Sequence, residues 1–250
     1  CVCANTSDKQ GVYAKQFLIS PRDLMHVKHL DLYGVANNHV MQHGESAYRE
    51  MLWYLGDHGV QYVGSLERRS TTFFHEGKKV GIMAFSQRPD NFSQHPLYWC
   101  LPEYSEIQSE LAKLADCDFR IVFVHWGNEF INYPYLDQKA FAHFMVDCGA
   151  DLIVGMHPHI LQGYEIYHGK HIFYSLGNCV FNMPWEPTKY SIMLQVDLSG
   201  DAIISYEYLK IGDDYFPEVV KDVPPGYRME HLNKFITLSN ENEIYYKQVF

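Results

Sequence analysis

Short apolar runs alternate along the chain with segments in which apolar residues recur every three or four positions. The strongest run covers 119–124 (FRIVFV) and predicts a buried strand. The clearest helical segment covers 44–58, where Tyr48, Met51 and Leu55 share one face and Gly59 follows as a left-handed cap. Further strands are predicted at 32–36, 80–85, 152–155 and 172–176, and further helices from Ser20, over 102–115 and over 137–148. This alternation indicates an α/β fold.

The pattern changes near residue 190. Apolar and polar residues alternate over 192–198, a Ser-Gly-Asp turn follows, and the alternation returns over 202–211, which predicts an antiparallel hairpin. A polar, proline-bearing linker is expected over 213–226, followed by a helix over 228–238. We therefore expect an α/β domain over 1–212 and a C-terminal extension, 213–250, whose helix packs on it.

Net charge and hydropathy argue against two classes of protein, nucleic-acid-binding and membrane-spanning. The 250 residues carry 20 basic and 30 acidic side chains, a net charge of −10, so no nucleic-acid partner is expected. No apolar stretch approaches the roughly 20 residues that span a bilayer. We expect neither a transmembrane segment nor a signal peptide in this chain, and the compartment stays open.

Three polar clusters each follow a predicted strand: Asn37-Asn38-His39, His125-Trp126-Gly127 and His157-Pro158-His159. Open α/β sheets bind ligands beyond the carboxyl ends of their strands, so the three clusters are expected at one rim. In an extended segment His157 and His159 would point to the same side and could grip a metal ion. An equally good interpretation is that the motif is a proline turn flanked by two surface histidines.

The other two clusters also have two interpretations. His125 is a hydrogen-bonded rim residue or, beside a second histidine cluster, a metal ligand. Asn38 could offer an amide oxygen to a metal and His39 could act as a general acid, although Asn-Asn-His is also an ordinary turn. His43 stays undecided, and the remaining histidines are expected to be solvated: His26, His29, His58, His75, His95, His143, His168, His171 and His231.

Longer stretches around these clusters carry a family resemblance. They are GVANNHVMQHG (34–44), VFVHWGNEF (122–130) and the segment 149–181, which contains GMHPH, LQGYE and YSLGN. The sequence resembles the CapA (PGA_cap) family, which is linked to bacterial poly-γ-glutamate capsule synthesis and is similar to the calcineurin-like metallophosphoesterases. The resemblance covers about residues 15 to 211 and implies a four-layer α/β/β/α sandwich with mixed sheets.

The resemblance also implies roles for individual residues. His39 would be the catalytic acid, and the metal ligands would be Asn38, His125, His157 and His159. Gln162, Glu165 and Asn178 would line or support the site. An intact site of this type holds two divalent metal ions, and Mn, Fe and Zn are not distinguished.

Two departures from the family pattern bear on activity. An opening strand with an Asp-based metal motif and an Asn-Leu-Glu motif are both absent from this sequence, so we expect it to be N-terminally incomplete with the first strand missing. Gln42 stands where the family commonly has Asp. The remaining candidate ligands are neutral, which predicts weak binding of two dications.

Two functions follow from these observations. The first is a metal-dependent hydrolase, phosphoesterase-like, that acts on a polymer or phosphoester substrate in capsule or poly-γ-glutamate biosynthesis. The second is a non-catalytic capsule-assembly or polymer-handling protein that keeps the fold without a complete metal site. Relatives are often membrane-tethered and extracytoplasmic, so membrane-associated capsule machinery is an expected partner.

Overall fold

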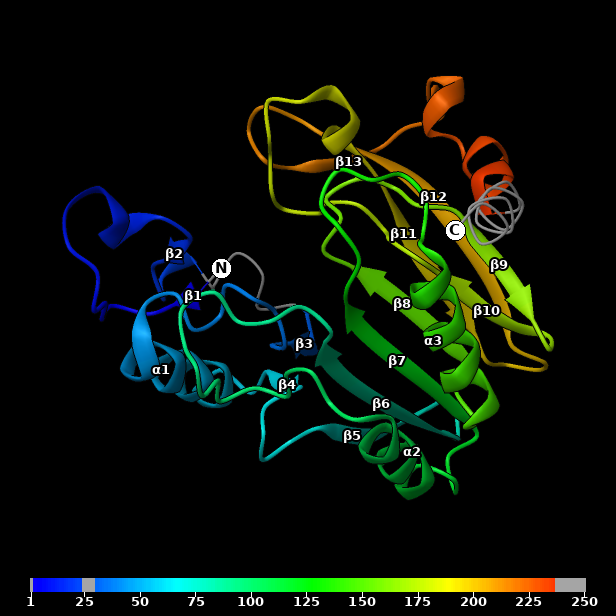
Figure 1. Cartoon of the computed structure of the whole chain (residues 1–250), viewed down its shortest axis with the longest axis horizontal. Coiled ribbons are helices and arrows are strands. Elements are labelled where there is room, and N and C mark those ends of the chain that lie inside the picture. Colours follow the sequence, from blue (N-terminus) through cyan, green and yellow to red (C-terminus); the bar gives the residue numbers. More distant parts are fainter. Residues whose placement is uncertain (1, 24–29, 237–250) are drawn as a thin grey trace, which may run out of the picture. The chain divides into compact units, whose positions relative to one another are not determined.

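A computed structural model of the chain describes residues 2–23 and 30–236 (Figure 1). The chain folds as two compact units. The first contains residues 1–71 and 82–110, and the second contains 72–81 and 111–250. The predicted division of the sequence at residue 212 stays a prediction.

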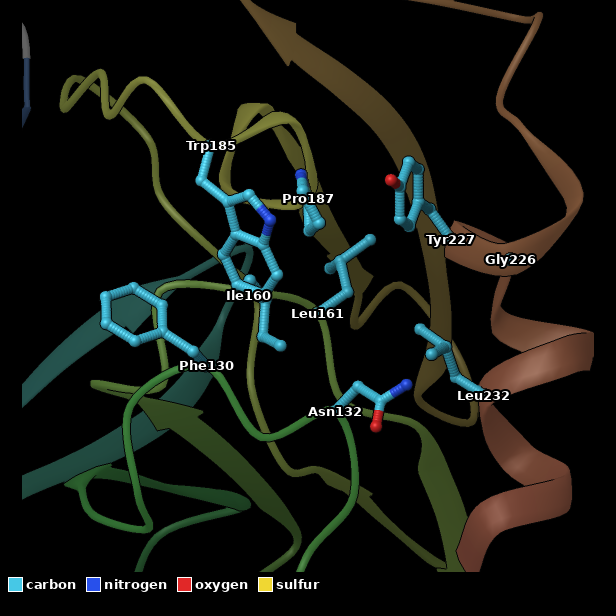
Figure 2. A pocket seen from close by; sticks show the side chains of 9 residues that line it. All are labelled: Phe130, Asn132, Ile160, Leu161, Trp185, Pro187, Gly226, Tyr227 and Leu232. Atoms are coloured by element: carbon cyan, nitrogen blue, oxygen red, sulfur yellow. The ribbon is translucent and has the colours of Figure 1, made fainter.

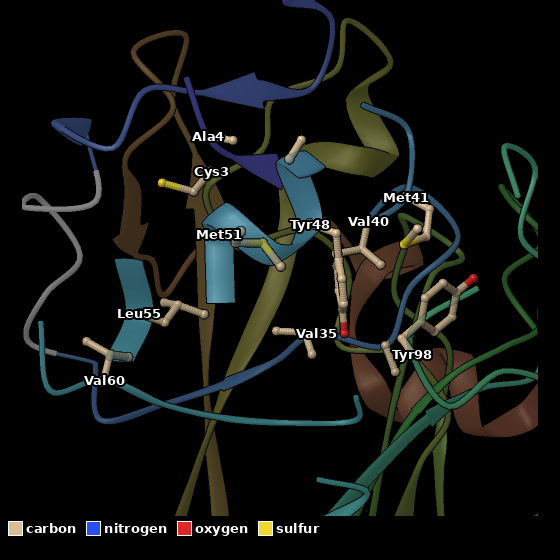
Figure 3. Packing of buried hydrophobic residues seen from close by; sticks show 12 residues of the cluster. Cys3, Ala4, Val35, Val40, Met41, Tyr48, Met51, Leu55, Val60 and Tyr98 are labelled. Carbon is tan, nitrogen blue, oxygen red and sulfur yellow. The ribbon is translucent and has the colours of Figure 1, made fainter. Parts of the chain in front are cut away.

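The first unit is built around one amphipathic helix. Helix α1 (Gly44–Asp57) buries Tyr48, Met51 and Leu55, the stripe that the sequence predicts. These side chains share an apolar cluster with Val35 and Val60 (Figure 3). Gly59 has φ 71°, the left-handed conformation expected just after the helix.

Four short strands also belong to the first unit. β1 (Val2–Cys3) pairs in parallel with β2 (Leu18–Ile19), and a 3₁₀ turn, Gly11–Lys15, lies between them in the sequence. β3 (Leu32–Gly34) pairs in parallel with β4 (Gln61–Val63). β3 confirms the strand predicted at 32–36. Pro21 and Arg22 form a turn, whereas the helix predicted to start at Ser20 falls mostly on residues 24–29, outside the described residues.

The main sheet has six strands, in the order β5 (Ser70–His75), β6 (Lys78–Ser86), β7 (Phe119–His125), β8 (Leu152–Met156), β10 (Lys170–Phe173) and β9 (Tyr164–Tyr167). β7, β8 and β10 run parallel, whereas β9 is antiparallel to β10. β5 and β6 are divided between the two compact units. The predicted buried strands at 80–85, 119–124, 152–155 and 172–176 correspond to four of these elements.

Both helices predicted between these strands are present. α2 (Tyr104–Lys113) buries Ile107 and Leu111. α3 (Leu136–Asp147) buries Phe141 and Met145 and covers one face of β7 and β8 (Figure 1). β7 and β8 are neighbouring parallel strands joined through α3, so this part is a parallel βαβ unit.

A second sheet contains the predicted hairpin. β11 (Tyr190–Asp197) and β12 (Ile203–Ile211) pair antiparallel, and a 3₁₀ turn, Glu186–Lys189, precedes them. The linker predicted over 213–226 is wrong in part, because β13 (Pro217–Val219) pairs antiparallel with β12 and Pro225–Tyr227 forms a 3₁₀ turn. No apolar periodicity marks a strand of three residues, so only its pairing partner reveals it.

The predicted C-terminal helix is present over residues 229–236, and its predicted end at 237–238 lies outside the described residues. Met229, Leu232 and Ile236 are buried, as the periodicity predicts. Asn233 accepts a hydrogen bond from the Tyr164 amide at 2.8 Å, which ties this segment to β9. None of the helices within the described residues is long and apolar enough to cross a membrane.

Candidate functional site

Two imidazoles meet at the carboxyl ends of neighbouring strands in the second unit. His125 is the last residue of β7, and His157 comes directly after β8. His125 pairs in register with Met156 on the neighbouring strand, and His157 is the next residue after Met156. The two histidines therefore lie at adjacent strand ends. The ring centroids lie 4.6 Å apart, and His157 is buried. The sequence prediction that these two clusters share a rim is consistent with this geometry.

The backbone of the His157-Pro158-His159 motif is not extended, and that expectation is wrong. His157 has φ 103° and His159 has φ 61°, both in the left-handed region that few non-glycine residues adopt. Hydrogen bonds from distant residues hold the bend, since the Phe130 amide donates to Pro158 O at 2.9 Å and Ser175 Oγ donates to Ile160 O at 2.8 Å. Strained backbone of this kind persists only where the surroundings enforce it.

Asn178 orients the third histidine. Its Oδ1 lies 2.8 Å from His159 Nδ1, and its Nδ2 donates to the Thr188 carbonyl oxygen at 3.1 Å. The second bond fixes which end of the amide faces His159, so His159 Nδ1 donates and its Nε2 is the acceptor. His157 and His159 have ring centroids 6.2 Å apart. Asn178 therefore holds the ring of His159 in place. The family resemblance implies a lining or supporting role for Asn178.

Gln162 anchors the loop that follows β7. Its Nε2 donates to the carbonyl oxygens of Ile131 and Tyr133 at 2.8 and 3.1 Å, and its Oε1 accepts from Gln138 at 3.3 Å. Gln162 itself is buried. It thus positions the residues beside His159, because the Phe130 amide of the same loop is bonded to Pro158.

Glu165 belongs to a separate polar cluster on β9. Its Oε1 accepts hydrogen bonds from Tyr174 Oη at 2.5 Å and from His143 Nε2 at 2.7 Å. Burial raises the pKa of the Tyr174 hydroxyl, which keeps this group protonated as a donor. His143 was expected to be solvated, and it instead stacks on Tyr167 with ring centroids 3.9 Å apart. The two partners His143 and Glu165 lie 22 residues apart on different elements, so no local spacing signals their contact.

The first unit holds Asn38 and His39 in the turn after β3. Asn38 is buried, and His39 lies between the rings of Phe17 and Phe92 at 4.6 and 5.8 Å. His39 Nδ1 is 2.9 Å from Oε1 of Gln42, whose Nε2 donates to the Gln16 carbonyl oxygen at 3.3 Å. Gln42 thus accepts the proton of His39 Nδ1, as an aspartate at this position would, but without a negative charge.

His43 has a structural role in the same turn. Its Nδ1 lies 2.8 Å from Ser7 Oγ and its Nε2 lies 2.7 Å from the Gln16 carbonyl oxygen. Both ring nitrogens therefore have partners within the first unit, and the side chain is buried. His43, for which the sequence predicted no definite role, thus holds Ser7 and Gln16 against the start of α1.

Comparison with known families decides the affiliation. The family described as bacterial capsule synthesis protein PGA_cap matches residues 5–183. The chain belongs to this family. It is 34% identical over 195 residues to the capsule biosynthesis protein CapA of Bacillus anthracis, covering 71% of this chain and 47% of that protein. It is 31% identical over 193 residues to the PGA biosynthesis protein CapA of Bacillus subtilis, covering 70% and 49%. The PGA_cap chain spans about half the length of these relatives.

Solved structures establish the fold class of this PGA_cap chain. A putative 5'-nucleotidase from Staphylococcus aureus matches with a TM-score of 0.52 at 14% identity, covering 85% of this chain and 42% of that chain. The 5'-nucleotidase precursor from Thermus thermophilus matches with a TM-score of 0.51 at 16% identity, covering 90% and 45%. The fold is metallophosphoesterase-like, as the family resemblance implies.

The family resemblance implies divalent metals, and the residues of the second unit fit such a group in part. Two imidazole nitrogens on one tetrahedral ion lie about 3.3 Å apart, which rings at the separation of His125 and His157 can reach. His159 has its Nδ1 held by Asn178, the arrangement that metal-ligating histidines usually show. Within residues 2–23 and 30–236, no group of three or more His, Cys, Asp or Glu side chains gathers as a metal site. The described residues therefore offer part of a ligand set, and it is neutral.

Proposed function

We propose that this PGA_cap chain serves capsule or poly-γ-glutamate biosynthesis through a metal-dependent, phosphoesterase-like hydrolase site. The paired imidazoles of His125 and His157 carry the proposal, because they lie at the strand ends where α/β sheets hold their ligands. The B. anthracis and B. subtilis relatives are named for capsule and PGA biosynthesis, which supports the polymer as the biological context.

In this proposal the histidines hold a divalent metal ion and His39 handles a proton. His125, His157 and His159 of the second unit would offer imidazole nitrogens, and the family resemblance assigns Asn38 of the first unit as a further ligand through its amide oxygen. When bound, such an ion would supply Lewis-acid chemistry toward a phosphoryl or acyl oxygen and lower the pKa of a bound water. His39, with its Nδ1 proton accepted by Gln42, would protonate the leaving oxygen from Nε2. Gln42 fixes the ring of His39 and adds no charge to it.

Removing the support of His159 should weaken metal binding. We expect Asn178→Ala to lower metal affinity about 10–100-fold, because the imidazole loses the acceptor that fixes its orientation. Asn178→Asp keeps an acceptor oxygen and should retain most of the affinity. Competition titration with a chromogenic chelator measures both variants, with Asn5→Ala, an exposed asparagine of the first unit, as the control. Equal affinity in Asn178→Ala and the wild type would show that the contact is not part of a metal site.

Hydrolysis assays test the proposed function itself. The full chain, loaded with Mn²⁺ or Zn²⁺, is assayed on simple phosphoesters and on γ-glutamyl amides, with and without EDTA. We expect one class to be cleaved, EDTA to abolish the activity, and His39→Ala to reduce it about 10²–10⁴-fold. His95→Ala, which alters an exposed histidine of the first unit, is the control and should keep full activity.

The second candidate is a non-catalytic assembly or polymer-handling protein. The neutral ligand set favours it, because the candidate ligands Asn38, His125, His157 and His159 include no carboxylate to offset the charge of two dications. The same assays separate the two candidates. A chain that binds metal and yet cleaves neither substrate class supports the non-catalytic function.

A further inference from the structure

A pocket of about 250 Å³ lies in the second unit (Figure 2). Its walls come from four separate segments: the loop after β7, the residues after His159, the turn before β11 and the C-terminal segment. Residues that line it include Phe130, Asn132, Ile160, Leu161, Trp185 and Tyr227. Figure 2 shows Trp185, Ile160 and Leu161 projecting between Phe130 and Tyr227. The pocket is thus largely aromatic and aliphatic, which is typical of sites for small molecules.

The pocket adjoins the histidine cluster. Ile160 and Leu161 directly follow His159 in the chain, and both are buried. The Phe130 ring stacks on His159 with centroids 6.0 Å apart and an interplanar angle of 27°. The Trp185 ring meets Phe130 edge-on at 5.5 Å and 83°. The rings of His159, Phe130 and Trp185 therefore contact one another in sequence, and the last two line the pocket. A ligand bound in the pocket would place the part of the molecule next to its ring beside His159.

The lining has no formal charge. Among the residues that the structure describes, those that line the pocket include no Lys, Arg, His, Asp or Glu. Polar atoms come from Asn132, Trp185 and Tyr227, which can direct a ligand but cannot neutralise an anion. A carboxylate or phosphate buried without a cationic partner is strongly disfavoured. The glutamate side chains of a poly-γ-glutamate strand therefore do not suit this pocket.

We propose that the pocket is the subsite for an uncharged ring of the substrate, next to the group that reacts at His159. This inference rests on the proposed function and adds the class of substrate to it. A cavity of about 150 Å³ holds a benzene ring, so 250 Å³ accommodates one six-membered ring with substituents. An aryl ring and the apolar face of a sugar ring share the required chemistry, and both would pack on Trp185 and Phe130.

Binding of matched ligands tests the subsite without relying on turnover. Calorimetry or saturation-transfer NMR compares methyl phosphate with phenyl phosphate and with glucose 1-phosphate on the metal-loaded full chain. We expect at least one ring ligand to bind about tenfold more tightly than methyl phosphate, an increase that corresponds to about 1.4 kcal/mol. Trp185→Ala should remove that preference. Trp53→Ala, which alters another exposed tryptophan in the first unit, should keep it. The ring that binds more tightly identifies the aryl or the sugar source.

A second set of ligands separates failure of the subsite from failure of the metal site. Phenol and methyl glucoside carry the ring without phosphate and are tested on His157→Ala, which lacks a proposed metal ligand. Binding that Trp185→Ala abolishes supports the subsite even if the metal site proves absent. Equal binding of methyl and ring phosphates, or a ring preference that survives Trp185→Ala, overturns the proposal. It is also overturned if γ-glutamyl-glutamate binds more tightly than the ring ligands and depends on Trp185.

Discussion

Replacing Gly155 with alanine is expected to destabilise the protein by about 3 kcal/mol or more, or to prevent folding. Gly155 lies on β8, two residues before His157. A β-carbon there would overlap the carbonyl oxygen of Tyr174 and the indole Nε1 of Trp126. Those two groups are themselves hydrogen-bonded at 2.8 Å, and both side chains are fully buried. The backbone after β10 and the residue after His125 would both have to move.

A second glycine supplies the matched control. Gly56 lies in α1 with open space around the position of a β-carbon, so Gly56→Ala should raise stability by about 0.5–1 kcal/mol. Urea denaturation followed by circular dichroism measures both variants. A Gly155→Ala protein that unfolds at the wild-type urea concentration would contradict the close approach of Tyr174 and Trp126 to β8.

Replacing Asp151 with alanine should cost about 2–4 kcal/mol of unfolding free energy. This buried carboxylate joins the starts of three strands. Its Oδ2 accepts from the backbone amide and Nε of Arg120 at 2.8 and 2.9 Å, and its Oδ1 accepts from Lys170 Nζ at 2.6 Å. Both cations are partly exposed, which keeps the loss below that of a fully buried ion pair.

The control for Asp151 is an ion pair in the same unit whose carboxylate is exposed. Asp213 contacts Lys189 at 3.0 Å with its side chain 91% exposed, so Asp213→Ala should leave the urea midpoint unchanged. Asp151→Asn keeps the shape and one acceptor oxygen and should fall between the wild type and Asp151→Ala. If Asp151→Ala and Asp213→Ala unfold at the same urea concentration, the carboxylate does not hold the strand starts together.

Local periodicity explains which parts of the fold the sequence predicts. Helix α1 and strand β7 are predicted because their apolar residues repeat at the period of the element they form. β13 is not, because three residues in a polar segment carry no period and depend on pairing with β12. The conformation of His157 and His159 is likewise set from outside the motif. Pro158 favours an extended conformation for the preceding residue, His157. Hydrogen bonds from Phe130 to Pro158 O and from Ser175 to Ile160 O hold the segment in a bend instead.

In the candidate site, too, some features follow from local sequence and others depend on tertiary contacts. The proximity of His125 and His157 follows from two parallel strands whose ends carry histidine. The contact between His159 and Asn178 joins residues 19 positions apart, and only the family resemblance pointed to it. The contact of Glu165 with His143 had no sequence signal, because it depends on where α3 lies against β9. Side-chain partners brought together by tertiary packing cannot be read from spacing.

Metal stoichiometry tests directly whether the imidazole pair of His125 and His157 belongs to a metal site. Elemental analysis is run on the purified full chain after reconstitution with Mn²⁺, Fe²⁺ or Zn²⁺, beside His125→Ala and His157→Ala. His168→Ala, an exposed histidine of the same unit, is the control. We predict about one or two ions per chain in the wild type and in His168→Ala, and a loss of metal in the other two variants. A wild type that binds no metal, or His125→Ala and His157→Ala proteins that bind as much as the wild type, would show that the imidazole pair holds no metal ion.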